Sequence, residues 1–215
     1  MEAEFLKAVQ AGQREQVAQM LDADPMLINT TNANGVSALL LAVYSGERAL
    51  ADDLIARGVL LNVFEAAAAN QVDRLKALLD ADPALANAYA PDGFQPLGLA
   101  AFFGHFEAAR LLLERGAPIN SPSRNPQQVM PLHSSVAGQH FALSQLLLER
   151  GADVNAAQEA GFTPLLEAAQ NGQREMIDLL LTHGADKSAR TSDGQSAVDL
   201  ARKAGHVELI DLLSP

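Results

Sequence analysis

Cysteine and tryptophan are both absent from this chain of 215 residues. Without cysteine the chain has no disulfide, no thiolate metal site and no cysteine nucleophile. Basic residues are few, because 15 lysines and arginines stand against 26 aspartates and glutamates, and the net charge of -11 disfavours nucleic acid as a partner. The N-terminus lacks a basic start followed by an apolar stretch, and no run approaches the roughly 20 apolar residues that span a bilayer. We therefore expect a cytoplasmic protein that binds neither nucleic acid nor membrane.

Internal repetition is the main feature that the sequence does have. The segments "MPLHSSVAGQHF", "TPLLEAAQNGQRE" and "SAVDLARKAGHVE" place Pro131, Pro164 and Ala197 at intervals of 33 residues, and a leucine-rich run follows each of them. Thr163 is a good N-cap and Pro164 suits the first helical position, so a helix is predicted to begin there. Gly172 then allows the left-handed turn that ends it. Each copy predicts two helices after a turn-rich segment.

These copies resemble the ankyrin repeat, and the resemblance covers essentially the whole chain. It implies an all-α solenoid of about seven helix-turn-helix repeats joined by β-hairpin-like fingers, in one domain over residues 1–215. The repeats are predicted at approximately 1–29, 30–61, 62–87, 88–120, 121–155, 156–188 and 189–215.

A second periodicity lies over the first. Residues 5–62 align without a gap onto residues 63–120, at an offset of 58. Since 58 is one repeat of 33 residues plus one shortened by eight, we predict that repeats 1 and 3 lack the preceding finger. In repeat 5, Gln139 stands where most other copies have glycine, and a left-handed backbone there costs about 1 kcal/mol.

The five histidines do not indicate a metal or catalytic site. His105, His133, His140 and His206 occupy places where the ankyrin pattern itself carries histidine for hydrogen bonding, and His183 has no ligand-spaced partner. The chain contains no phosphate-binding loop, dinucleotide fingerprint, zinc-protease motif or nucleophile elbow. We predict no catalytic, cofactor-binding or metal-binding residues and no enzymatic activity.

The resemblance implies a scaffold or adaptor that binds another protein through a concave face. In such proteins this face consists of the finger tips and the exposed ends of the first helices, so the assignment rests on the family and needs its own test. Mapping the pattern residue by residue gives the candidate contacts Val36, Tyr44, Ala68, Ala69, Tyr89, Asp92, Phe94, Phe102, Phe103, Val129, Met130, Phe162, Gln170 and Asn171.

Repeat 3 is predicted to leave a notch in that face. It lacks a finger, and it carries Ala68 and Ala69 where the next repeat carries Phe102 and Phe103. The notch would receive an anchoring side chain or a loop of the partner, since binding energy concentrates in aromatic-lined pockets. The alternative is that Phe102 and Phe103 fold inward and fill the space. If the notch is open, Ala68→Glu should abolish binding and leave the melting curve nearly unchanged.

Two other phenylalanines differ in their expected environment. Phe94 is expected at a finger tip, where it is hard to bury without a partner, and Phe106 is expected in the core. Two further functions stay open: a dedicated inhibitor or immunity protein for a basic toxin or enzyme, favoured by the acidic charge, and a small-ligand receptor or enzyme. The chain is expected to be a monomer when unbound, and the sequence does not name its partner.

Overall fold

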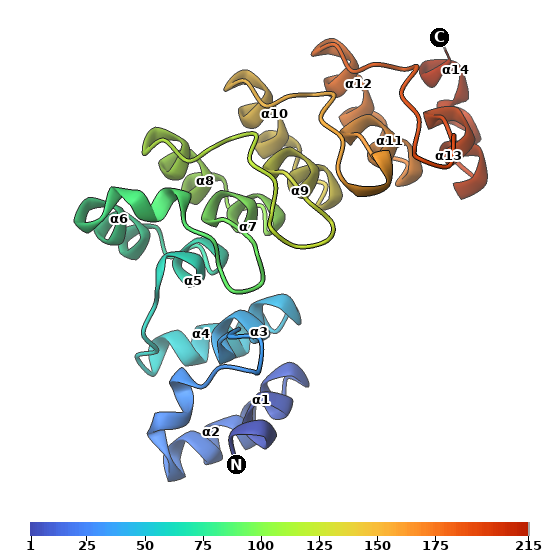
Figure 1. Cartoon of the computed structure of the whole chain (residues 1–215). Helices are drawn as coiled ribbons and strands as arrows, with labels where there is room; N and C mark the ends of the chain where they lie inside the picture. The colour runs from blue at the N-terminus through green and yellow to red at the C-terminus, as the bar shows by residue number, and fades with distance from the viewer. Residues whose placement is uncertain (215) are drawn as a thin grey trace.

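Short helices alternate in pairs along the chain in this computed structural model, which describes residues 1–214 (Figure 1). The first helices of the pairs are α1 (Glu2–Gln10), α3 (Ala38–Tyr44), α5 (Val63–Ala68), α7 (Pro96–Phe102), α9 (Pro131–Ala137), α11 (Pro164–Gln170) and α13 (Ala197–Ala204). The second helices are α2 (Arg14–Ala23), α4 (Arg48–Ala56), α6 (Val72–Ala81), α8 (Phe106–Glu114), α10 (Phe141–Glu149), α12 (Arg174–Thr182) and α14 (Ile210–Leu213). We number these pairs 1 to 7 in chain order.

Extended connections precede pairs 2, 4, 5, 6 and 7, and we call them fingers 2, 4, 5, 6 and 7. Residues 30–37 form finger 2 and residues 88–95 form finger 4. Isolated antiparallel bridges close fingers 2 and 7, between Thr31 and Ser37 and between Arg190 and Ser196. The described residues contain no longer strand, so the predicted all-α class is confirmed.

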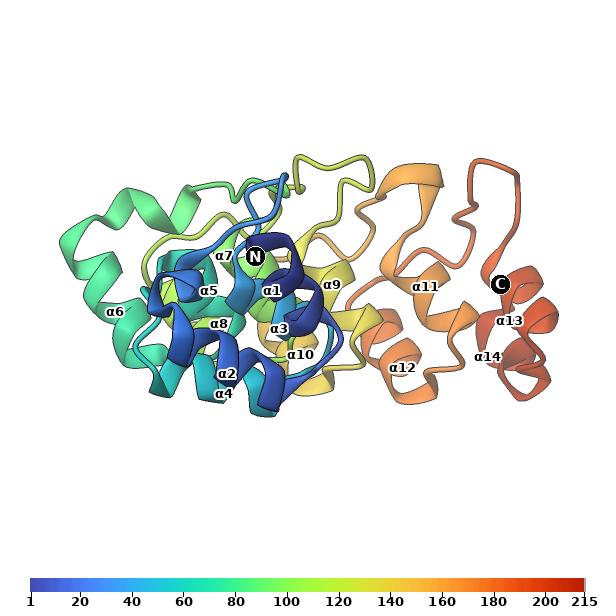
Figure 2. The same ribbon diagram turned by 90° about the horizontal axis from the view of Figure 1, so that it is seen from below.

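The pairs stack side by side into an arc. The first helices lie along its inner side and the second helices along its outer side (Figure 1), while the fingers project from one long edge, the upper edge in Figure 2. Stacking buries apolar faces that no single pair could cover alone. Leu97, Leu112, Leu147 and Leu165, from three successive pairs, are each at most 1% exposed.

Helix boundaries follow the local sequence signals. The Thr163 hydroxyl accepts a hydrogen bond from the Leu166 amide at the start of α11, and Pro164 occupies the first helical position. Gly172 has a φ of 69°, and Gln139, in the equivalent place of pair 5, has a φ of 58°. The predicted left-handed turn at Gln139 is therefore confirmed.

The duplication is present in the structure as well as in the sequence. Helices α2 and α6, α3 and α7, and α4 and α8 begin and end 58 residues apart. The 3₁₀ helices η1 (Pro25–Asn29) and η2 (Pro83–Asn87) show the same offset. Each is capped by an aspartate: Asp24 accepts from the amide of Met26, and Asp82 accepts from the amide of Ala84. Residues at equivalent places in the two units can therefore be compared directly.

Buried side chains form two clusters that divide the core between pairs 2 and 3. The first, which we call the N-terminal cluster, contains the core residues from Phe5 to Val59 together with Ala68 and Leu99, and the second cluster runs from Val63 to Leu213. Leu99 belongs to α7, so pair 4 packs directly against the N-terminal pairs. The solenoid bends at the same place, between α4 and α5 (Figure 1).

Candidate functional site

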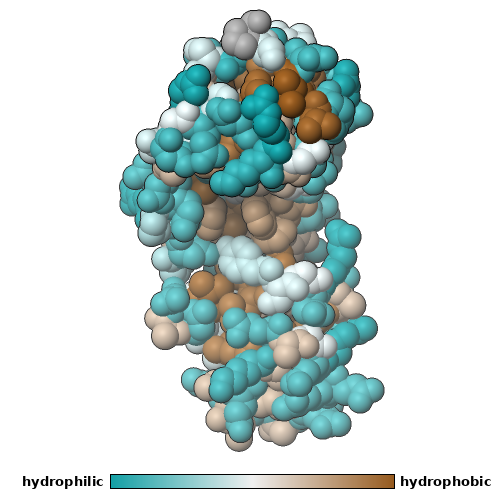
Figure 3. All heavy atoms as spheres, turned by 90° about the vertical axis from the view of Figure 1, so that its right-hand side faces the viewer, coloured by the Kyte–Doolittle hydropathy of each residue, from teal (hydrophilic) through white to brown (hydrophobic). Residues whose placement is uncertain are grey.

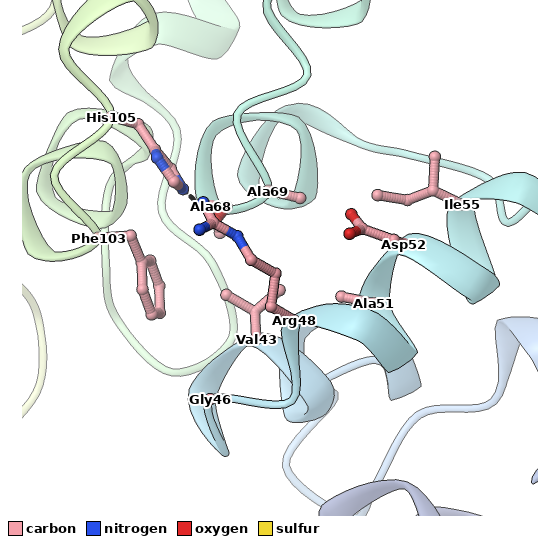
Figure 4. A pocket seen from close by; sticks show the side chains of 10 residues that line it. All are labelled: Val43, Gly46, Arg48, Ala51, Asp52, Ile55, Ala68, Ala69, Phe103 and His105. Carbon is pink, nitrogen blue, oxygen red and sulfur yellow. Dashed lines mark hydrogen bonds between the residues drawn. The ribbon is translucent and has the colours of Figure 1, made fainter. Parts of the chain in front are cut away.

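A pocket lies at the bend between pairs 2 and 3, and we call it the inter-pair pocket (Figure 4). It has a volume of about 330 Å³. Its lining residues are Val43, Gly46, Arg48, Ala51, Asp52, Ile55, Ala68, Ala69, Phe103 and His105. One wall comes from α3 and α4, and the opposite wall comes from the end of α5 and the turn between α7 and α8.

The local sequence of α5 explains why space remains there. With no finger before it, α5 begins at a capping box: the Asn62 side chain accepts from the amides of Phe64 and Glu65, and a Glu65 carboxylate oxygen accepts from the Asn62 amide. The helix then ends in alanines. Ala68 and Ala69 present only methyl groups to the pocket, where pair 4 presents the Phe103 ring.

Phe103 lines the pocket, and two further aromatic rings pack against it. Phe103 stacks on Tyr44 with ring centroids 5.8 Å apart and meets Phe102 edge to face at 5.0 Å. Phe102 is 45% exposed, whereas Phe103 is half-buried and packs against the N-terminal cluster. The two rings therefore differ: Phe103 packs inward and Phe102 remains accessible.

Fingers 2 and 4 meet across pair 3, which has no finger of its own. The Tyr44 hydroxyl donates to a carboxylate oxygen of Asp92 in finger 4 at 2.6 Å. Burial, and then the Asp92 carboxylate, hold the pKa of the Tyr44 phenol above its usual value. Gly35 of finger 2 lies so close to finger 4 that a Cβ on it would be 3.0 Å from Pro91 Cβ. Fingers 2 and 4 therefore close the space above pair 3 on the finger side. The pocket opens on the other side, at the turns between the first and second helices.

The titratable groups of the inter-pair pocket are Arg48, Asp52 and His105. The His105 Nε2–H donates to the Ala68 carbonyl at 2.9 Å. Burial lowers the pKa of His105, the hydrogen bond to Ala68 opposes this, and the charge of Arg48 lowers it further. The Arg48 guanidinium makes no hydrogen bond and no ion pair with any residue from 1 to 214.

No group of three or more histidine, aspartate or glutamate side chains in the described part of the chain could hold a metal ion. Over residues 1–214, every helix is too short or too polar to cross a bilayer.

Comparison with known families fits this architecture. A family model described as ankyrin repeats, in three copies, matches residues 63–158 and 145–215. The chain belongs to the ankyrin-repeat family. Ankyrin repeats are general protein–protein interaction modules and are typically not enzymes. None of the curated proteins matches this ankyrin-repeat chain.

Several residues predicted as contacts of the ankyrin-repeat chain come together at the inter-pair pocket. Ala68, Ala69 and Phe103 line it, and Tyr44 stacks on Phe103. Within this group the alanines differ, because Ala68 is only 1% exposed and belongs to the N-terminal cluster, whereas Ala69 is partly exposed. Because Ala68 is buried, we expect Ala68→Glu to lower the stability of the chain instead of sparing the melting curve.

Two more predicted contacts are less accessible than the pattern suggested. Val36 is 7% exposed and belongs to the N-terminal cluster. Phe94 is not exposed at a finger tip. It is half-buried and packs against the N-terminal cluster without any partner protein. Finger 4 turns this ring inward where it crosses pair 3.

The remaining predicted contacts lie outside the inter-pair pocket. Tyr89 is partly exposed in finger 4, with the Arg124 guanidinium 3.8 Å from its ring centroid, and Asp92 holds Tyr44. Val129 and Met130 are partly exposed, and Phe162 packs partly against the second cluster. Gln170 and Asn171 are exposed at the end of α11. Whether any of them contacts a partner stays a prediction.

Phe106 was expected in the core, and this expectation is wrong. The side chain is 37% exposed at the start of α8. Phe141 occupies the matching place in α10 and is 43% exposed. Between these two places, the His140 Nε2–H joins pair 5 to pair 4 by donating to the Phe102 carbonyl at 3.0 Å. On the face that Figure 3 shows, apolar side chains are gathered in the middle of the molecule, with hydrophilic side chains around them.

Three of the four histidines predicted to make hydrogen bonds, His105, His133 and His140, join neighbouring pairs, whereas the His206 ring makes no hydrogen bond to residues 1–214. Besides His105 and His140, the His133 Nε2–H donates to the Phe162 carbonyl at 3.2 Å, and burial lowers the pKa of His133 to about 4. The sequence interpretation missed Arg48 and Asp52. The sequence does place Arg48 at the start of α4, next to the repeat without a finger. It does not show that Arg48 and Asp52 line one pocket, because that depends on the bend between pairs 2 and 3.

Proposed function

We propose that this ankyrin-repeat protein binds another protein along its inner face and that the inter-pair pocket receives an anchoring side chain of the partner. The observation that supports the proposal is the pocket itself, an opening of about 330 Å³ in which the end of α5 faces the Phe103 ring and into which the Arg48 side chain extends. Anchoring side chains in such pockets supply most of the binding energy of many interfaces.

We also propose the repeat and domain organisation that the sequence predicted. Each helix pair is one ankyrin repeat, with the boundaries given above, and residues 1–215 form one domain that is monomeric when unbound. The proposed setting is cytoplasmic, with no nucleic acid or membrane as partner. Tyr44, Phe102 and Phe103 are the proposed contacts nearest the pocket, and the more distant predicted residues extend the surface along the inner face.

The acidic composition favours one specialised form of the same activity. A net charge of -11 would accelerate association with a basic partner, as in a dedicated inhibitor or immunity protein for a basic toxin or enzyme. Its association rate would fall steeply as salt is added, whereas a scaffold anchored mainly by apolar contacts would show a weak salt dependence.

Filling the pocket should abolish capture of the partner without unfolding the chain. Ala69 is partly exposed at the end of α5, so in Ala69→Gln the longer, uncharged side chain occupies the pocket at little cost to stability. Proteins captured from lysate of the source cell by immobilised wild type should be lost from this variant. Quantitative mass spectrometry of the captured proteins, with melting curves of both chains, provides the measurement.

Ala81→Gln is the matched control, because Ala81 is the exposed last residue of α6 on the outer side of the arc. It makes the same chemical change and should retain every partner. If a folded Ala69→Gln chain captures the same proteins as wild type, the inter-pair pocket is not the binding site.

A further inference from the structure

Arg48 differs from an arginine in the equivalent place of another pair. Arg14 is the first residue of α2, as Arg48 is of α4, and it forms a two-pronged ion pair with Asp53, the sixth residue of α4, at 2.8 and 3.0 Å. The sixth residue of α6 is Ala77. The next pair therefore offers Arg48 no carboxylate where Arg14 has one.

The inter-pair pocket surrounds this unpaired guanidinium. In Figure 4 the Arg48 side chain extends between the α4 wall and Ala68, toward His105. Asp52, one turn further along α4, also lines the pocket, yet it forms no ion pair with Arg48 within 4.0 Å. Val43, Ile55 and Phe103 provide apolar surface on either side.

We infer that the inter-pair pocket selects a partner segment in which a carboxylate is adjacent to an apolar side chain, the carboxylate binding Arg48 and the apolar group packing on Phe103. This inference rests on the proposed function, because it specifies what that pocket recognises. A guanidinium matches a carboxylate with two parallel hydrogen bonds. Apolar walls strengthen the pairing because they exclude water. The carboxylate is either an acidic side chain or the C-terminal carboxylate of the partner.

Two substitutions in the pocket should change binding in opposite directions. Arg48→Gln removes the charge that pairs with the ligand, so a carboxylate peptide should bind about tenfold more weakly. Asp52→Asn removes a negative charge that repels the ligand, so the same peptide should bind several-fold more tightly. Arg174→Gln is the matched control, since Arg174 begins α12 in the equivalent place but lies outside the pocket, and it should leave the affinity unchanged.

The probe is a random peptide library, displayed with free C-termini and selected on the immobilised wild-type chain. Peptides that bind wild type but not Ala69→Gln define the pocket ligands. One of them is then synthesised as the free acid, as the C-terminal amide, and with each acidic residue replaced by its amide. Titration calorimetry against wild type, Arg48→Gln, Asp52→Asn and Arg174→Gln identifies which carboxylate the pocket binds.

The outcomes separate this inference from the proposed function. Loss of affinity on removal of one carboxylate, with the opposite effects of the two pocket variants, supports the inference and names the source of the carboxylate. Pocket ligands that lack a carboxylate, or that bind Arg48→Gln as tightly as wild type, overturn it and leave the proposed function standing. If no selected peptide is lost on Ala69→Gln, both are overturned.

Discussion

Ala68→Glu should lower the free energy of unfolding by about 3 kcal/mol or more. Ala68 is 1% exposed, belongs to the N-terminal cluster, and supplies the carbonyl that His105 binds. A glutamate there must either bury its carboxylate or push α3 and α5 apart, and both cost free energy. Urea denaturation of the variant and wild type, followed by circular dichroism, measures the difference.

The matched control for this prediction is Ala81→Glu. Ala81 is exposed at the end of α6, and substitutions at such places change stability by no more than about 0.5 kcal/mol. An Ala68→Glu chain that unfolds at the wild-type urea concentration would show that α5 does not pack against the N-terminal pairs as described.

Glu167→Gln should raise the free energy of unfolding by about 3 kcal/mol at pH 8 and change it little at pH 4. Glu167 lies on α11 with its Oε2 buried and without a hydrogen-bond partner in the described residues, and burial raises its pKa from the usual 4.5 to about 7. Each pKa unit corresponds to about 1.4 kcal/mol. Denaturant titrations of both chains at several pH values provide the measurement.

The sign follows from the raised pKa. Below pH 4.5 the carboxyl is protonated in both folded and unfolded chains, and its contribution to stability is fully present. As the pH rises through 7 that contribution is lost, because the folded chain must then bury a charge, and glutamine avoids this loss. His133, whose pKa is lowered to about 4, titrates in both chains and cancels in the difference. An equal gain at pH 4 and pH 8 would contradict the buried carboxyl.

Local features of the fold were predictable from the sequence because each depends on a few neighbouring residues. The left-handed turn at Gln139 follows from its place among glycines, and the helix start at Pro164 follows from its cap. The offset of 58 residues predicted that α6 and η2 would repeat α2 and η1. These features require no knowledge of how one pair is placed against another.

The candidate site was predictable only in part, because it depends on how the stack closes across a missing finger. The alignment of the repeats puts Ala68 and Ala69 where the next pair has two aromatic rings, and this correctly indicated a space at pair 3. The contact between Tyr44 and Asp92 spans that pair and turns the opening away from the fingers. No short sequence pattern encodes that contact, so the pocket's orientation and the role of Arg48 could not be read from the repeat.

Amide hydrogen exchange tests most directly whether the inter-pair pocket is the protein-binding site. Exchange of the wild-type chain would be measured alone and with a partner that it captures, at peptide resolution. If the partner binds at the inter-pair pocket, new protection should be concentrated in residues 43–52, 66–71 and 102–106, which carry the pocket wall. Protection confined to the outer helices α8, α10 and α12, with those three segments unchanged, would contradict binding at that pocket.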